Sequence, residues 1–477
     1  MRKSTICIFL LFSVTLLKGQ SKEAEIDSIV QLFVEYTHFN GSVLAAENGE
    51  VVYKNAFGYA NMEWQIPNTT KTRFKLASLG KQFTALLIMQ MVEEGKIELT
   101  GKICDYIPDY PKESGTIITI HQLLTHTSGI PNYHVISDYS PNQGRAYTRD
   151  EYLNLFKNKP LMFTPGTQSY YSNLGYFVLG YILEKVSGKS YTQLLKEKIF
   201  EPAGMTNSNC EEEKHIIPNM AYGYNFIYTG YEPAHYRHPS QVFGAGNIMT
   251  TVEDFLKYDQ ALHNNILLSE KYLKQINTRH PKASGYGWNI STYPKSESDS
   301  VTLATHDGGT FGFVSVAYRF LEDKKLIVVF SNSSPYDVYG LASSIGRVLY
   351  NRKRLYPKKS YVEEFAVTVS KFSVDSAVTQ FHFLKKNEPD LYSLESEAFN
   401  LLGYSYLESR QFEAAIAVFK INVGAFPDDG NLYDSLAEAY MLNGQRELAI
   451  FNYKKALELD PNNSNSKVML AKLLESK

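Results

Sequence analysis

Ser78 and Lys81 are the residues of this sequence whose types and spacing point most directly to chemistry. They stand three positions apart in the stretch Ser78-Leu79-Gly80-Lys81. Residues at i and i+3 share one face of a helix, so the hydroxyl and the amine can come within hydrogen-bonding distance. A buried lysine has a lowered pKa and can take the hydroxyl proton. The spacing therefore predicts an activated nucleophile with its base one turn away.

A helix must hold this pair in place. The pattern predicts a helix from Ser78 to Glu94, ended by Gly95, and its interior at 83–92 is apolar almost all round. That pattern is typical of a helix buried inside a domain. The helix N-terminus adds free N–H groups and the positive end of the dipole. An N-cap serine beside an exposed lysine is the alternative interpretation, which the apolar helix disfavours.

Two further motifs stand where side chains can point into a cleft. Tyr171-Ser172-Asn173 follows a Pro165-Gly166 loop and precedes a helix expected to begin near Leu174. Loops at such junctions often carry functional residues, and a tyrosine packed at a helix start is the alternative. His306-Asp307-Gly308-Gly309 closes an expected strand. Glycine there allows close backbone approach, and a plain turn is the alternative.

Composition excludes several other chemistries. The 477 residues carry 48 Lys plus Arg, 50 Asp plus Glu and a net charge of −2, which is unlike a general nucleic-acid binder. Three cysteines exclude a disulfide scaffold and a four-cysteine zinc site. The 11 histidines form no cluster with metal-ligand spacing, His235 and His238 being the closest. We expect no metal and no organic cofactor.

The elements around the motifs indicate an α+β domain over residues 27–350. A hairpin with an Asn48-Gly49 turn joins strands at 41–46 and 51–53. Further strands are expected at 301–304, 314–319 and 326–331, and helices at 117–130, 150–157 and 174–200. One antiparallel sheet flanked by helices, with a helical subdomain, accounts for this order. Residues 351–390, which begin with a basic stretch, are interpreted as a linker.

The C-terminal part, 391–477, repeats itself at 34 residues and resembles the tetratricopeptide repeat. Two full units and a terminal helix fall below the roughly three needed for independent stability. We therefore expect the array to pack on the rest of the protein or on residues 360–390. A groove for a peptide or protein partner and a purely structural appendage remain equal alternatives. The matching positions are Leu402/Leu436, Tyr406/Tyr440, Ala415/Ala449, Ile416/Ile450, Phe419/Tyr453 and Pro427/Pro461.

The N-terminus resembles an export signal. Arg2 and Lys3 precede a 12-residue apolar run at 6–17, which would rise only about 18 Å as a helix, too short to span a bilayer. We expect residues 1–20 to be a cleaved signal peptide and the protein to be periplasmic or secreted, without a transmembrane segment. Cys104 and Cys210 would remain, either paired or as two independent packed thiols.

Taken together, the motifs resemble the penicillin-recognising serine hydrolases. The order S-x-x-K, Y-x-N, H-x-G is similar to the class C β-lactamase branch, which includes D-Ala-D-Ala carboxypeptidases, D-aminopeptidases and esterases. The resemblance covers about residues 27–350. Supporting stretches that also look like this family are 74–78, 123–131, 165–167 and 244–246.

The resemblance implies a role for each motif residue. Ser78 would become acylated, and Lys81 and Tyr171 would share the proton transfers, with the primary base left open. The N–H groups of Ser78 and Gly309 would form the oxyanion hole. Asn173 and Gly308 would contact substrate. His306 would face the leaving-group side.

Two departures from the family pattern bear on the substrate. β-Lactamases of this branch usually carry Lys where His306 stands, and histidine holds a carboxylate less firmly than lysine. If Asp307 faces the cleft, it would repel a C-terminal carboxylate. Both favour an esterase or D-amino-acid peptidase that uses an acyl-enzyme. The alternatives are a β-lactamase or D-Ala-D-Ala carboxypeptidase acting on cell-wall peptides, and a non-catalytic binding module.

Overall fold

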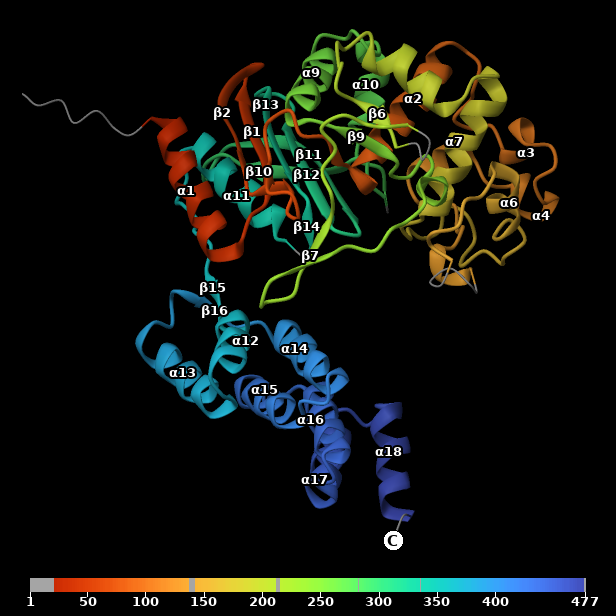
Figure 1. Ribbon diagram of the computed structural model, residues 1–477. Coiled ribbons are helices and arrows are strands. Elements are labelled where there is room, and N and C mark those ends of the chain that lie inside the picture. The colour runs from red at the N-terminus through yellow and green to blue at the C-terminus, as the bar shows by residue number, and fades with distance from the viewer. Residues whose placement is uncertain (1–20, 137–141, 212–214, 282, 335, 476–477) are drawn as a thin grey trace, which may run out of the picture.

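The computed structural model describes residues 21–136, 142–211, 215–281, 283–334 and 336–475. The expected signal peptide, 1–20, lies outside the described residues. Figure 1 shows a mixed α/β domain joined to a separate C-terminal array of helices. In the described part of the chain, no helix is both long and apolar enough to cross a membrane.

A six-stranded antiparallel sheet forms the centre of the first domain, as predicted. Its strand order is β10-β11-β12-β13-β1-β2. The first hairpin therefore pairs with β13, the strand of this sheet that comes last in the chain, and Val43 lies opposite Val329. Asn48 and Gly49 have φ of 52° and 81°, the left-handed geometry of a tight hairpin turn. The strands are β1 (Gly41–Glu47), β2 (Glu50–Phe57), β10 (Asn289–Pro294), β11 (Ser300–Thr310), β12 (Phe313–Phe320) and β13 (Lys325–Ser331).

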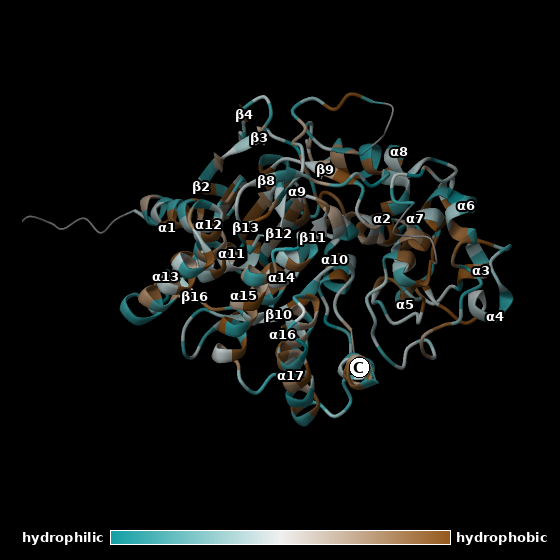
Figure 2. Ribbon diagram, turned by 60° about the horizontal axis from the view of Figure 1, so that its bottom comes forward, coloured by the Kyte–Doolittle hydropathy of each residue, from teal (hydrophilic) through white to brown (hydrophobic). Residues whose placement is uncertain are grey.

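Helices cover both faces of this sheet. On one face, α1 (Lys22–Thr37) and α11 (Val338–Leu349) share an apolar core with the strands. On the other face a larger core contains α2 (Lys81–Glu93), α7 (Asn173–Ser187) and α9 (Val252–His263). Every residue of α2 from 81 to 91 is buried, and Figure 2 marks α2 and α7 as largely hydrophobic. The helical subdomain adds α3 (Ile103–Tyr106), α4 (Lys112–Gly115), α5 (Ile120–Leu124), α6 (Arg149–Asn154), α8 (Tyr191–Leu195) and α10 (Glu270–Ile276).

Short elements complete the domain. Besides the 3-10 turn that carries Ser78, described below, they include two turns and a π-helical segment. The strands are β3 (Tyr59–Asn61), β4 (Ile66–Pro67), β5 (Phe74–Lys75), β6 (Asn209–Cys210), β7 (Tyr224–Phe226), β8 (Tyr231–Pro233), β9 (Ile248–Thr250) and β14 (Ser333–Ser334). The helical segments are η2 (Tyr133–Val135), η3 (Lys196–Phe200) and η4 (Pro239–Val242).

The C-terminal array begins earlier than the repeat pattern alone indicates. Within the segment interpreted as a linker, residues 361–387 form two amphipathic helices whose apolar faces join the core of the repeats. This is the support that two full repeat units were expected to need. The strands β15 (Lys359–Ser360) and β16 (Tyr392–Ser393) pair in parallel. The helices are α12 (Tyr361–Lys371), α13 (Val374–Asn387), α14 (Ser396–Glu408), α15 (Phe412–Ala425), α16 (Gly430–Leu442), α17 (Arg446–Leu459) and α18 (Ser464–Glu475).

Polar contacts connect the array to the first domain next to α1. His38 Nε2 lies 2.6 Å from Glu363 Oε1 on α12, and this partner raises the pKa of the imidazole. The Lys359 ammonium lies 4.9 Å from the centre of the Tyr36 ring. Tyr228 also packs against the array core. The array is thus held at one edge of the first domain, away from the motif residues.

Cys104 and Cys210 form no disulfide with each other. Cys210 is buried, and Cys104 is half-buried with its thiol directed at the Tyr110 carbonyl, 3.5 Å away. They are the two independent thiols that the sequence left as one alternative.

Candidate active site

The proposed nucleophile lies in a strained turn directly before α2. Ser78 belongs to the 3-10 turn η1 (Ala77–Gly80), so the helix predicted from residue 78 becomes an α-helix only at Lys81. Ala77 has a φ of +48°, a left-handed conformation that costs a non-glycine residue about 1–3 kcal/mol. Such strain persists only where surrounding contacts fix the backbone. The turn therefore holds Ser78 in one position.

Three neighbours fix this turn. The Leu76 N–H donates to the Ile248 carbonyl at 2.9 Å, and the Leu76 carbonyl accepts from Ser315 Oγ at 2.8 Å. Gly246 packs so closely that a Cβ there would lie 2.9 Å from the Ala77 carbonyl carbon. A strand on each side and a glycine loop thus clamp the residues before Ser78.

Lys81 is enclosed by three oxygen atoms. Its side chain has no exposed surface, and Nζ lies 3.0 Å from Ser78 Oγ, 2.7 Å from Asn173 Oδ1 and 2.9 Å from the Ala245 carbonyl. Burial lowers the pKa of the amine well below its ordinary value, a shift that the charge of Asp307 opposes. A neutral amine has two N–H groups and one lone pair. It can donate to Asn173 and Ala245 while its lone pair faces the seryl hydroxyl.

Asn173 stands at the first position of α7 and is itself held. Its Nδ2 group lies 3.2 Å from Asn132 Oδ1, which fixes the side-chain oxygen towards Lys81. Ser172 caps the helix by accepting from the Gly175 N–H, and its hydroxyl donates to the Pro131 carbonyl at 2.9 Å. The loop at 131–132 thus orients the Y-x-N motif. The expected substrate contact at Asn173 is therefore also a Lys81 contact.

Tyr171 lies over the Ser78–Lys81 pair. The Lys81 amine is 4.8 Å from the centre of its ring. Burial raises the pKa of this phenol above its ordinary value, more than the neighbouring Ser78 side chain lowers it. The group is therefore a phenol at neutral pH. The residue as a whole remains 39% exposed, which leaves an edge open to substrate.

His126 supports Tyr171 and was not singled out from the sequence. Its ring lies 4.5 Å from that of Tyr171, centre to centre, and Nδ1 accepts from the Ser172 N–H at 3.1 Å. Burial, with Lys81 nearby, keeps the pKa of His126 well below its usual value. A neutral histidine thus positions the Y-x-N motif. The only signal for it was the stretch 123–131, which contains this residue.

His306 is a buried, neutral imidazole. Burial, with the Lys81 amine nearby, lowers its pKa to about 4. Nδ1 lies 2.6 Å from the Asp307 carbonyl oxygen, so this nitrogen donates and Nε2 carries the lone pair. The ring lies 6.5 Å from that of Tyr171. The side chain that stands in place of the family's lysine thus carries no charge at neutral pH.

Gly308 and Gly309 have different surroundings. A Cβ on Gly308 would lie 1.9 Å from the Leu76 carbonyl oxygen, whereas one on Gly309 would meet nothing within 4 Å. Gly308 therefore lets β11 approach the turn that carries Ser78, rather than making room for substrate. Gly309 and Ser78 line one small cavity of about 60 Å³ with Asn173 and Arg237. The two residues predicted to form the oxyanion hole thus face a common space.

On its other side, Ser78 opens into a cavity of about 330 Å³. Tyr171, His306 and Asp307 line this cavity. Residues of the segment 284–289, among them Trp288, form one wall of this cavity. The wall lies close to α2, since a Cβ added to Gly287 would be only 2.7 Å from Gln82 Cα. This wall was not predicted, because the segment 284–289 consists of turn residues with one tyrosine and one tryptophan and carries no chemical motif. Within the described residues, no group of three or more His, Cys, Asp or Glu could hold a metal ion.

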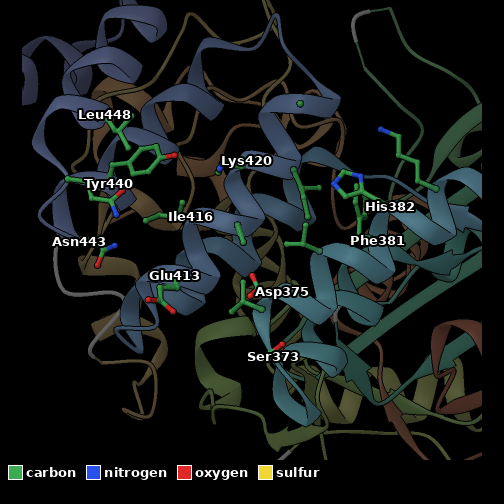
Figure 3. A pocket seen from close by; sticks show the side chains of 17 residues that line it. Ser373, Asp375, Phe381, His382, Glu413, Ile416, Lys420, Tyr440, Asn443 and Leu448 are labelled. Atoms are coloured by element: carbon green, nitrogen blue, oxygen red, sulfur yellow. The ribbon is translucent and has the colours of Figure 1, made fainter.

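A second hollow lies in the repeat array, shown in Figure 3. It has a volume of about 1060 Å³ and runs between α13, α15 and the junction of α16 with α17. Ile416 and Lys420 lie along its floor, with His382 on one side and Tyr440 on the other. It is distant in the chain from the motif residues and shares none of them.

The fold and the geometry around Ser78 define a serine hydrolase with a Ser-x-x-Lys centre. Comparison with known families then places the chain: the β-lactamase family profile matches residues 26–346, and the tetratricopeptide repeat profile matches residues 430–463. The chain belongs to the β-lactamase family, whose members hydrolyse amides and esters, and carries a C-terminal repeat.

Individual relatives cover the same region. Penicillin-binding protein 4* of Bacillus subtilis is 29% identical over 335 residues, 66% of this chain and 72% of that protein. Teichoic acid D-alanine hydrolase of Staphylococcus aureus is 29% identical over 309 residues, 64% of this chain and 72% of that protein. The structure of D-amino acid amidase from Ochrobactrum anthropi matches with a TM-score of 0.57 and 25% identity, over 68% of this chain and 97% of the other.

Proposed function

We propose that this protein hydrolyses an ester or an amide through an acyl-enzyme at Ser78, as an esterase or a D-amino-acid peptidase. The observation that carries this proposal is the setting of Lys81, whose two N–H groups are engaged by Asn173 and Ala245. Ser78 Oγ lies 3.0 Å from Nζ, so in the neutral amine the remaining lone pair is available for the seryl proton. General-base removal of a proton is worth about 10²–10⁴ in rate.

The steps follow from these positions. Ser78 Oγ attacks the substrate carbonyl while its proton passes to Lys81, and the negative oxygen is stabilised by the N–H groups of Ser78 and Gly309. The Lys81 proton reaches the leaving group through the Tyr171 phenol, since a phenol with a raised pKa both donates and accepts a proton without becoming a stable anion. Water then enters, gives its proton back along the same route and releases the acid. Lys81 is therefore the primary base, and Tyr171 transfers protons.

Two relatives act, by name, on D-alanine in teichoic acid and on D-amino acid amides. These relatives support the proposal that this chain hydrolyses an ester or an amide. The neutral His306 also supports them, because it gives no fixed positive charge to hold a substrate carboxylate. A β-lactamase or D-Ala-D-Ala carboxypeptidase activity is less favoured for the same reason. A non-catalytic binding module would have no use for the buried amine of Lys81.

A fluorophosphonate probe tests the proposal. We expect intact-mass spectrometry to show one adduct on the wild type, located on Ser78 by peptide mapping, and no adduct on Ser78→Ala. Ser464→Ala is the matched control, because Ser464 and Lys467 have the same spacing at the start of α18, away from the cleft. An unlabelled wild type would contradict the proposed function, and equal labelling of Ser78→Ala would show that the wrong serine was chosen. A panel of p-nitrophenyl esters, D-alanine amides, D-Ala-D-Ala peptides and nitrocefin then ranks the substrates.

For the repeats we propose a protein partner at the hollow of Figure 3. Its lining combines the apolar Ile416 and Leu448 with Glu413 and Lys420, a mixture suited to a polypeptide segment. A photo-crosslinker at position 448 should give one discrete adduct that Lys420→Glu abolishes, with a crosslinker at exposed Leu474 as control. Equal adducts at both positions would contradict this. We also propose export, directed by residues 1–20, to the periplasm or the medium.

A further inference from the structure

Asp307 introduces a negative charge at the cavity beside Ser78. Its neighbour His306 is buried, yet both residues line the 330 Å³ cavity together with Ser78 and Tyr171. The sequence left open whether Asp307 faces the cleft, and the structure places it there. A cavity of this size has room for a small acyl group.

A second residue holds the Asp307 carboxylate in place. Tyr339, at the start of α11, donates its hydroxyl to Oδ1 at 2.6 Å. The second carboxylate oxygen is not used by this bond. Among the ion pairs of the described residues, none includes Asp307. The carboxylate is thus oriented by a neutral donor, and its charge is left for a ligand to neutralise.

The other titratable groups around the cavity do not cancel this charge. His306 and His126 are neutral at physiological pH because burial lowers their pKa values. Lys81 is engaged with Ser78, Asn173 and Ala245. The negative charge of Asp307 nevertheless acts on the site, since it raises the pKa of both Lys81 and the Tyr171 phenol. The cavity is therefore electronegative beside the nucleophile.

We propose that Asp307 is the specificity-determining residue of this cleft and selects small amino-acid esters or amides whose ammonium group is free. The ammonium would pair with the carboxylate while the substrate carbonyl lies against Ser78. The same charge would repel a substrate with a carboxylate in that position. This inference rests on the proposed function, because it names the substrate class of the same site.

Matched substrates test this selectivity. D-Alanine p-nitroanilide carries the ammonium, and N-acetyl-D-alanine p-nitroanilide lacks it. The measured quantity is the ratio of their kcat/KM values, which removes any common loss of activity. We expect Asp307→Asn to lower this ratio about tenfold, since it removes one charge-assisted contact. Tyr339→Phe should lower the ratio less, because this variant keeps the Asp307 carboxylate and removes only the hydrogen bond that orients it.

Asp337→Asn is the control, since Asp337 caps α11 near Tyr339 and does not line the cavity. Its ratio should equal that of the wild type. A ratio that stays constant in Asp307→Asn, or a wild type that prefers the acetylated substrate, would overturn the proposal.

A binding measurement separates this inference from the proposed function. D-Alanine amide should slow fluorophosphonate labelling of the wild type more than N-acetyl-D-alanine amide does, and Asp307→Asn should lose that difference. If Ser78 is labelled but the two amides compete equally, the selectivity is wrong and the hydrolase assignment stands. If the wild type is not labelled at all, the proposed function fails first, and the substrate-class inference fails with it.

Discussion

Replacing Lys81 by methionine is the sharpest test of the catalytic geometry. Methionine has nearly the same length and fits a buried position, so the change removes the amine without opening a cavity. Turnover should fall by about 10²–10⁴, the usual worth of a general base. The Asn173 and Ala245 oxygens lose their donor, which costs about 1–3 kcal/mol for each buried acceptor left unsatisfied. Removing an amine that is costly to bury offsets part of this loss.

The pH dependence of stability gives a second signature of the same substitution. Burial lowers the folded-state pKa of Lys81 below its unfolded value. Between the two values the unfolded chain binds more protons, so the free energy of unfolding rises with pH over that interval. Lys81→Met removes this contribution. The stability difference between wild type and variant should therefore shift in favour of the wild type as pH rises towards about 10.

Both effects are measured on one pair of proteins. Steady-state hydrolysis of a p-nitrophenyl ester gives kcat/KM, and urea unfolding at pH 6, 7.5 and 9 gives the free energies. Lys75→Met is the matched control, because Lys75 pairs with Glu211 outside the cleft. Undiminished turnover in Lys81→Met would refute the assignment of the base. A stability difference that does not change with pH would show that the amine is charged in the folded protein.

Two further predictions concern the buried imidazole of His306 and the buried ion pair between Arg319 and Asp259. Because burial lowers the pKa of His306 to about 4, unfolding free energy should rise between about pH 4 and 6.5, and His306→Gln should flatten that rise in urea titrations; an unchanged slope would contradict a neutral imidazole. Arg319 lies 2.5 Å from Asp259 in a buried ion pair, so Arg319→Leu should destabilise the fold by about 3–5 kcal/mol, whereas Arg319→Leu with Asp259→Leu should recover most of that loss. Calorimetry of the single and double variants checks it, and equal losses in both would count against the pairing.

Local patterns were enough to predict the central elements. The Asn48-Gly49 turn and the apolar strands around it specify the hairpin, because few other turns match the strand twist. The helix behind Ser78 was predicted because its residues are apolar on every side. Spacing singled out Ser78 with Lys81, whereas Tyr171 with Asn173 and His306 with its glycines were singled out from their places beside expected elements and from the family resemblance. The structure brings all three motifs together around one cleft.

Other features depend on contacts between distant residues and leave no local pattern. The left-handed backbone at Ala77 could not be predicted, because the residue is not a glycine. Contacts of Leu76 and Gly246 impose this conformation. His126 matters because of the ring of Tyr171, 45 positions later in the chain. The bond between Asp307 and Tyr339 spans 32 residues. The two helices at 361–387 were not predicted, because the basic stretch at 351–360 led to the whole segment 351–390 being interpreted as a linker.

The order of the strands has a consequence for how the chain is made. β1 pairs with β13, so Val43 meets its partner only after Val329 has been synthesised. The ribosome adds about 5–20 residues per second, and the sheet cannot close until nearly 290 further residues have emerged. Throughout that interval the first hairpin has one edge without its neighbour. A nascent chain of this design therefore cannot complete its central sheet until most of its residues have been made.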